Sequence, residues 1–91
     1  MPKINRINWN PSFKRAFRKR ILGTPVESAF RNRLELFIED PFYPGLRTHK
    51  LTGMLDGLWA FSVSLDCRVI FEFISSEEIT IIDIGTHKDV Y

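Results

Sequence analysis

Apolar residues recur at helical spacing along the first half of the chain. Phe13, Phe17 and Ile21 lie on one face of a helix over residues 12–22, because each follows the last by one helical turn. A second stripe with similar spacing consists of Val26, Phe30, Leu34 and Phe37. Polar and charged residues stand between the apolar positions, as in helices that bury one face and expose the other. The pattern predicts two consecutive amphipathic helices.

The ends of these stripes carry typical helix start and stop signals. Asn10-Pro11-Ser12 precedes the first helix, and each of its members favours a helix start. Thr24 and Glu27 have the spacing of a capping box before the second helix. Gly23 suits the end of the first helix, and Asp40-Pro41 ends the second, because the residue before proline avoids the helical region. The short link predicts an antiparallel helical hairpin.

The rest of the chain has the pattern of β-strands. Residues 59–64 alternate large apolar with small side chains, while 68–74 and 79–84 are rich in β-branched and aromatic residues, and 79–84 suits a central strand. Two prolines and a glycine place a loop at 41–48, and residues 3–8 predict a short opening strand. The order is β-α-α-β-β-β. We therefore expect an α+β fold, with the helical hairpin packed on an antiparallel sheet that ends in a three-strand meander.

Length and composition narrow the class of protein. Ninety-one residues suit one domain over 1–91, and a hydrophobic fraction of 44% with eight Phe supports a packed core. The single Cys67 excludes an internal disulfide framework, and the polar start of the chain does not resemble a signal peptide. No apolar run reaches the ~18 residues of a membrane span. These features favour a cytoplasmic protein with no membrane partner.

Charge is distributed unevenly along the chain. Residues 1–50 hold eleven Lys/Arg and four Asp/Glu, a balance of +7, whereas residues 51–91 have a balance of −5. The basic residues of the first predicted helix are Lys14, Arg15, Arg18, Lys19 and Arg20. A basic face of this kind is compatible with a polyanionic partner, but solvated Lys and Arg faces are also common on helices without one.

Candidate chemistry is confined to a few histidine, arginine and tyrosine side chains. The sequence has no P-loop and no GxGxxG motif, and one cysteine with two distant histidines does not make a zinc site. His49 precedes the meander, Arg68 opens its second strand, and His87 and Tyr91 follow its last strand. In an antiparallel pair the end of one strand lies beside the start of its neighbour, so we expect Arg68 and His87 at one end of the sheet.

These residue types suit the cleavage of RNA. The 2′-hydroxyl attacks its own phosphate, so the protein supplies a base, a cation for the phosphorane and an acid for the leaving oxygen. Histidine serves as base or acid near neutral pH, arginine binds phosphate oxygens, and tyrosine stacks on an unpaired base. Structural roles are the alternative. Arg68 can pair with Glu72 or Asp66, while Gly85 can be a turn glycine and Tyr91 a core plug.

Two stretches carry a resemblance to a known family: HKLTGMLDGLWAFSVSLDCRVIFEF, from 49 to 73, and ITIIDIGTHKDVY, from 79 to 91. They resemble the RelE/ParE superfamily of type II toxin–antitoxin toxins, and the RelE/YafQ-like ribonucleases most. The resemblance implies a RelE-like fold in a small cytoplasmic toxin that cleaves mRNA, often in the ribosomal decoding site. It also implies a cognate antitoxin as a protein partner, with mRNA and ribosomal RNA as further partners.

The resemblance implies roles for individual residues. Arg68 matches the arginine that contacts the scissile phosphate, His87 matches a candidate general acid, and Tyr91 matches an aromatic residue that contacts the nucleotide. His49 matches an upstream histidine and is the expected general base, with Asp66 as the other candidate. The basic residues expected to contact RNA are Lys14, Arg15, Arg18, Lys19, Arg20, Lys50 and Lys88.

One departure from the family pattern leaves other functions open. Ser62 stands where YafQ-like members often carry a further histidine, which puts the identity of the general base in question. ParE-like members of the superfamily inhibit DNA gyrase by a protein contact and need no catalytic set. The ending with His87 and Tyr91 weighs against that function. A third alternative is an inactive domain that only binds an antitoxin. None of the three requires a metal ion or a small-molecule cofactor.

Overall fold

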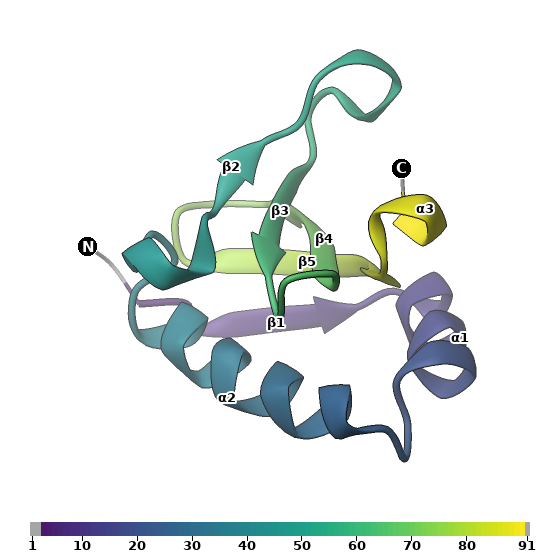
Figure 1. Cartoon of the computed structure of the whole chain (residues 1–91). Helices are drawn as coiled ribbons and strands as arrows, with labels where there is room; N and C mark the ends of the chain where they lie inside the picture. The colour runs from purple at the N-terminus through teal and green to yellow at the C-terminus, as the bar shows by residue number, and fades with distance from the viewer. Residues whose placement is uncertain (1–2, 91) are drawn as a thin grey trace.

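The computed structural model describes residues 3–90 and shows helices packed beside a single sheet (Figure 1). The strands are β1 (Arg6–Trp9), β2 (His49–Lys50), β3 (Trp59–Ser62), β4 (Arg68–Phe73) and β5 (Glu78–Gly85). The helices are α1 (Pro11–Arg20), α2 (Pro25–Glu39) and α3 (His87–Val90), with short 3-10 turns η1 (Pro44–Leu46) and η2 (Gly53–Leu55). None of the described helices is long and apolar enough to cross a membrane.

The sheet has five strands in the order β1-β5-β4-β3-β2, and the expected antiparallel meander of β3, β4 and β5 is confirmed. The short strand β2, which the sequence did not predict, pairs antiparallel with β3 at the edge of the sheet. The expectation of a wholly antiparallel sheet was wrong, because β1 pairs with β5 in parallel, with Ile7 opposite Ile79. The chain crosses from β1 through both helices before it enters the meander. That route leaves β5 with neighbours on both sides, in the central position that its apolar sequence predicts.

The main core lies between the two long helices and one face of the sheet. Phe37 of α2 is fully buried, and its ring stacks on Phe61 at 4.6 Å and meets Phe71 edge-on at 4.9 Å between centroids. The ring centroids of Phe13 on α1 and Phe30 on α2 are 5.7 Å apart, so the two helices also pack on each other. The predicted stripes therefore form the core. The opposite face carries a smaller cluster of Leu51, Ala60 and Ile70, against which Leu55, Leu58 and Val90 pack.

The helix starts confirm one expectation and correct another. The Asn10 side chain accepts a hydrogen bond from the Ser12 N–H at 2.9 Å and caps α1 as expected. At α2 the capping box is not formed, because the Thr24 hydroxyl donates to the Ile21 carbonyl at 2.6 Å. Glu27 accepts from the Gly23 N–H at 2.9 Å instead. Gly23 has a left-handed backbone with φ of 79°. The hydrogen bond from its N–H, and next the hydrogen bond from Arg31, lower the pKa of the Glu27 carboxyl.

The burial of Phe37 leads to a stability prediction. Phe37→Ala should lower the free energy of unfolding by about 3–5 kcal/mol, because it leaves a cavity between Phe61 and Phe71. Leu36→Ala is the matched control on the same helix, since Leu36 is 38% exposed, and it should cost less than about 1 kcal/mol. Urea unfolding followed by circular dichroism measures both. Equal losses in the two variants would contradict this account of the core.

Candidate active site

The strand register brings Arg68 to the same end of the sheet as the segment that carries His87. Arg68 at the start of β4 lies directly opposite Gly85 at the end of β5. His87 follows two residues later as the first residue of α3. On its other side Arg68 lies opposite Ser62 of β3. The expectation that Arg68 and His87 lie at the same end of the sheet is therefore confirmed at the level of the backbone.

A capping box that we did not anticipate from the sequence builds the short helix α3. Asp89 accepts hydrogen bonds from both the backbone N–H and the hydroxyl of Thr86, at 2.9 and 3.0 Å. The Asp89 N–H in turn lies 3.3 Å from the Thr86 hydroxyl. These bonds from Thr86, followed by the nearby charge of Arg20, lower the pKa of the Asp89 carboxyl. The capping interaction is thus complete at neutral pH and is lost as acid protonates Asp89 below its ordinary pKa.

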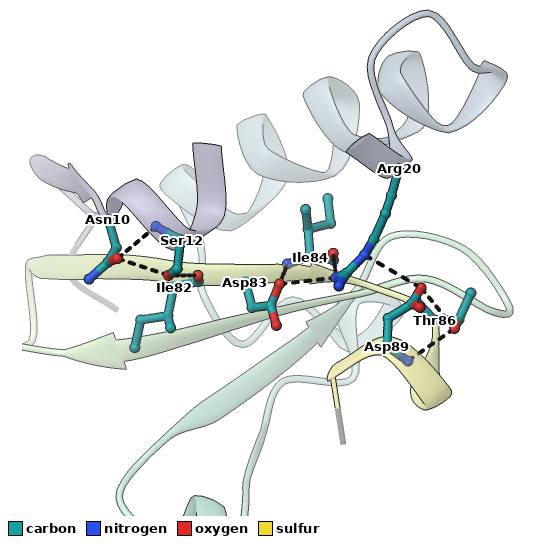
Figure 2. A network of polar contacts seen from close by, with 8 residues as sticks. All are labelled: Asn10, Ser12, Arg20, Ile82, Asp83, Ile84, Thr86 and Asp89. Atoms are coloured by element: carbon teal, nitrogen blue, oxygen red, sulfur yellow. Dashed lines mark hydrogen bonds and ion pairs between the residues drawn. The ribbon is translucent and has the colours of Figure 1, made fainter. Parts of the chain in front are cut away.

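Arg20 joins α1 to β5 and α3. Its Nη1 donates to the Ile84 carbonyl at 2.8 Å and lies 3.2 Å from an Asp83 carboxylate oxygen, while its Nε lies 3.9 Å from Asp89 (Figure 2). Asp83 is itself held by the Ile84 N–H at 2.8 Å. We call this set of contacts the Arg20 clamp. Arg20 was expected to contact RNA; because its partly exposed guanidinium already has partners within the protein, we leave it out of the proposed RNA surface.

Gly85 makes the Arg20 clamp sterically feasible. A Cβ at this position would lie 2.7 Å from the Asp89 Cβ and 2.8 Å from the Arg20 Nη1. Gly85 is the last residue of β5 and its φ is not positive, so the interpretation of Gly85 as a turn glycine was wrong. The sequence needs a glycine here because two side chains close over the backbone.

The Arg68 side chain is half-buried and has no carboxylate partner in the described part of the chain. The ion pairs over residues 3–90 involve other residues, so the structural alternative of a pair with Glu72 or Asp66 is not observed. A permanently charged guanidinium in this state can bind an anion without first breaking an internal ion pair.

His49 lies in β2 at the edge of the sheet and is exposed. It is opposite Ala60, which faces away from the main core, so the His49 side chain belongs to the same face of the sheet as Arg68. Its Nδ1 lies 2.9 Å from the Arg47 carbonyl. A carbonyl only accepts hydrogen bonds, so Nδ1 carries a hydrogen and Nε2 of the neutral ring is free to accept a proton. The Cα atoms of His49 and Arg68 are about 12 Å apart by sheet geometry.

The remaining predicted residues that the structure describes lie in four places. Asp66 is exposed in the turn between β3 and β4 and lines a cavity of about 170 Å³ with Cys67 and Asp89. Lys50 is exposed in β2, and Lys88 is exposed on α3. On α1 the exposed basic residues are Lys14, Arg15, Arg18 and Lys19. The predictions for Tyr91 concern a residue outside the described part of the chain.

Residues 3–90 form neither a cluster of metal ligands nor a reactive thiol. No group of three or more His, Cys, Asp or Glu side chains lies close enough together in this range to hold a metal ion. Cys67 is 5% exposed, and burial raises the pKa of its thiol, so at neutral pH it is a protonated core residue and not a nucleophile.

Comparison with solved structures assigns the fold. YafQ from E. coli superposes with a TM-score of 0.74 at 17% identity, over 93% of this chain and 96% of YafQ. A copper-bound mutant toxin from Helicobacter pylori matches with a TM-score of 0.71 at 22% identity, over 100% of both chains. This chain has the fold of the RelE/YafQ-like toxins. YafQ within the E. coli DinJ–YafQ toxin–antitoxin complex also matches, with a TM-score of 0.71 at 17% identity, over 93% and 94%. No family model and no curated protein matches the sequence.

Sequence reasoning missed the residues that hold the site together. The signal for the cap of α3 was visible, since Thr86 and Asp89 have the spacing of a capping box. No sequence signal indicated that the Arg20 side chain contacts β5, because Arg20 stands in a run of basic residues that are otherwise exposed.

The packing around Gly85 predicts the effect of a single methyl group. Gly85→Ala should destabilise the protein by about 1–3 kcal/mol, because the new Cβ pushes against Arg20 and Asp89. Thermal unfolding of the wild type, Gly85→Ala, Arg20→Ala and the variant with both changes makes a double-mutant cycle. The methyl group should cost less once Arg20 is gone. The same cost in both backgrounds would show that Arg20 does not limit the space above Gly85.

Proposed function

We propose that this protein is the toxin of a toxin–antitoxin pair and an endoribonuclease that cleaves mRNA bound to the ribosome. The observation that carries the proposal is the strand pairing of Arg68 with Gly85, which sets a guanidinium without a carboxylate partner in residues 3–90 beside the segment that carries His87. The shared fold with YafQ, which is a toxin in its complex with DinJ, supports the same function. We place the protein in the cytoplasm, where its RNA substrate would be.

The order of the strands suits in-line cleavage. His49 lies on β2, Arg68 on β4, and His87 follows β5, so the arginine stands between the two histidines across the sheet. An in-line displacement needs its base and its acid on opposite sides of the phosphorus. The side chains of His49 and Arg68, whose Cα atoms are about 12 Å apart, can contact the same nucleotide.

Each proton and bond has an assigned place in the proposed reaction. His49 Nε2 takes the proton of the 2′-hydroxyl, whose oxygen forms a bond to phosphorus. Arg68 donates hydrogen bonds to the two non-bridging oxygens as negative charge develops on them. The bond from phosphorus to the 5′-oxygen breaks, and His87 gives that oxygen a proton. The products are a 2′,3′-cyclic phosphate and a 5′-hydroxyl. We assign Tyr91 to stacking on the base, and Asp66 to the rim of the site.

Binding to the ribosome and to an antitoxin completes the proposal. The exposed basic residues proposed to contact RNA phosphates are Lys14, Arg15, Arg18, Lys19, Lys50 and Lys88. Contacts of this kind weaken as salt rises, so association with the ribosome should be salt-dependent. The antitoxin is proposed by analogy with the DinJ–YafQ complex.

Cleavage of translated mRNA tests this function. His87→Ala and Arg68→Ala should each reduce cleavage by about 100- to 10,000-fold, because each removes a group that acts in the transition state. Arg6→Ala, at the far edge of the sheet on β1, is the charge-matched control and should cleave like wild type. Primer extension on a reporter mRNA in a reconstituted translation system gives the rates.

Two results would contradict the proposal in different ways. If His87→Ala and Arg68→Ala cleave as fast as wild type, the assigned roles are wrong. If the wild-type protein leaves mRNA intact but its expression stops DNA replication, the gyrase-directed function replaces the nuclease. Thermal unfolding of each variant shows whether it is folded under the assay conditions.

A further inference from the structure

A cavity lined by three arginines opens beside Arg68, at the end of β3. Its volume is about 190 Å³, enough for a phosphate-sized anion. Arg33 comes from α2, Arg47 from the segment after η1, and Arg68 from β4. The remaining lining residues are Gly45, Ser62, Val63, Ser64 and Leu65, so the wall contains two hydroxyls and no carboxylate. Neither Arg33 nor Arg47 was singled out by the sequence.

The guanidinium of Arg33 is held in place by the backbone. Its Nη1 donates to the Gly45 carbonyl at 3.1 Å. A Cβ on Gly45 would lie 3.1 Å from the same nitrogen, so a larger residue at this position would force the end of the Arg33 side chain to shift by a few tenths of an ångström. None of the ion pairs over residues 3–90 involves Arg33, Arg47 or Arg68. Three permanent cations that share a cavity without an acidic partner leave a binding site for an anion.

Arg47 is the only described non-glycine residue with a positive φ, at 52°. Left-handed backbone costs such a residue about 1 kcal/mol or more, and it persists where the surrounding structure enforces it. Here it turns the chain so that the Arg47 carbonyl meets Nδ1 of His49 while the side chain lines the cavity. The same residue therefore belongs both to the cavity and to the support of the proposed general base.

We propose that Arg33, Arg47 and Arg68 bind a backbone phosphate of the substrate RNA next to the scissile phosphate; this inference rests on the proposed nuclease function. Arg68 lies between Ser62, which lines the cavity, and Gly85, which leads to His87. A phosphate at the scissile position and one in the cavity would therefore lie on opposite sides of this guanidinium. Arg33 and Arg47 would anchor the strand and set its register over the histidines.

A nucleic acid fits this site better than an acidic peptide. A single-stranded RNA that reaches Arg68 carries a phosphate on every nucleotide, so the next phosphate is available where the cavity opens. The planar forks of arginine match phosphate oxygens with two hydrogen bonds each, and the hydroxyls of Ser62 and Ser64 can add donors. A carboxylate of an antitoxin is the competing ligand, and the experiment includes it as an outcome.

Binding of an RNA that cannot be cleaved separates this inference from catalysis. A fluorescent oligoribonucleotide with 2′-O-methyl groups lacks the attacking hydroxyl, and fluorescence anisotropy gives its dissociation constant at several salt concentrations. Arg33→Gln removes the charge but keeps a donor for the Gly45 carbonyl, and Arg47→Asn suits left-handed backbone. Arg6→Gln is the matched control at the opposite edge of the sheet.

We expect each cavity variant to weaken binding about tenfold and to reduce the slope of log K against log salt by about 0.7, the value for one lost contact to single-stranded RNA. Arg6→Gln should change neither quantity. Unchanged binding by Arg33→Gln and Arg47→Asn would overturn the inference, and it would do so even if the cleavage results for His87 and Arg68 stand. Retained RNA binding with weakened binding to acidic peptides would assign the cavity to a protein partner and overturn it as well.

Discussion

The Arg20 clamp is the interaction on which the arrangement of this site depends. One guanidinium donates to the Ile84 carbonyl and pairs with Asp83 on β5, while its other edge faces Asp89 on α3. Asp89 caps α3 through Thr86, so α1, β5 and α3 are joined in one network. Val90 of α3 also packs against the smaller cluster on one face of the sheet. The clamp keeps the segment with His87 at the end of the sheet where Arg68 begins.

The Arg20 clamp fixes the position of α3 but adds little to the free energy of unfolding. The Arg20 and Asp83 side chains are 28% and 29% exposed, and ion pairs with this access to water contribute below about 1 kcal/mol each. The aromatic core around Phe37, whose side chains are fully buried, lies on the other side of the sheet from His49. Because the core and the proposed site lie on opposite faces of the sheet, the site can face solvent and bind a polyanion without loss of core packing. The same arrangement also explains why Gly85, which contributes no side chain, is required at the junction.

Local patterns in the sequence predicted the helices, the meander and the common end of Arg68 and His87. Each of these follows from spacing over a few residues, through the stripes of α1 and α2 and the alternation along the strands. The parallel pairing of β1 with β5 was not predictable in this way, because it joins residues about seventy positions apart. The same limit applies to Arg20 and to the cavity arginines. Arg33, Arg47 and Arg68 meet only because α2, the η1 segment and β4 converge in three dimensions.

The central claim is that Arg20 holds the segment from Thr86 to Val90 against the sheet, and amide hydrogen exchange tests it most directly. In Arg20→Gln the N–H groups of Thr86, Asp89 and Val90 should exchange roughly tenfold faster than in wild type, as expected of a local opening. Those of Val69 and Ile81 in the sheet should keep their wild-type rates. Unchanged exchange at α3 in the variant, or equal acceleration throughout the sheet, would contradict the account.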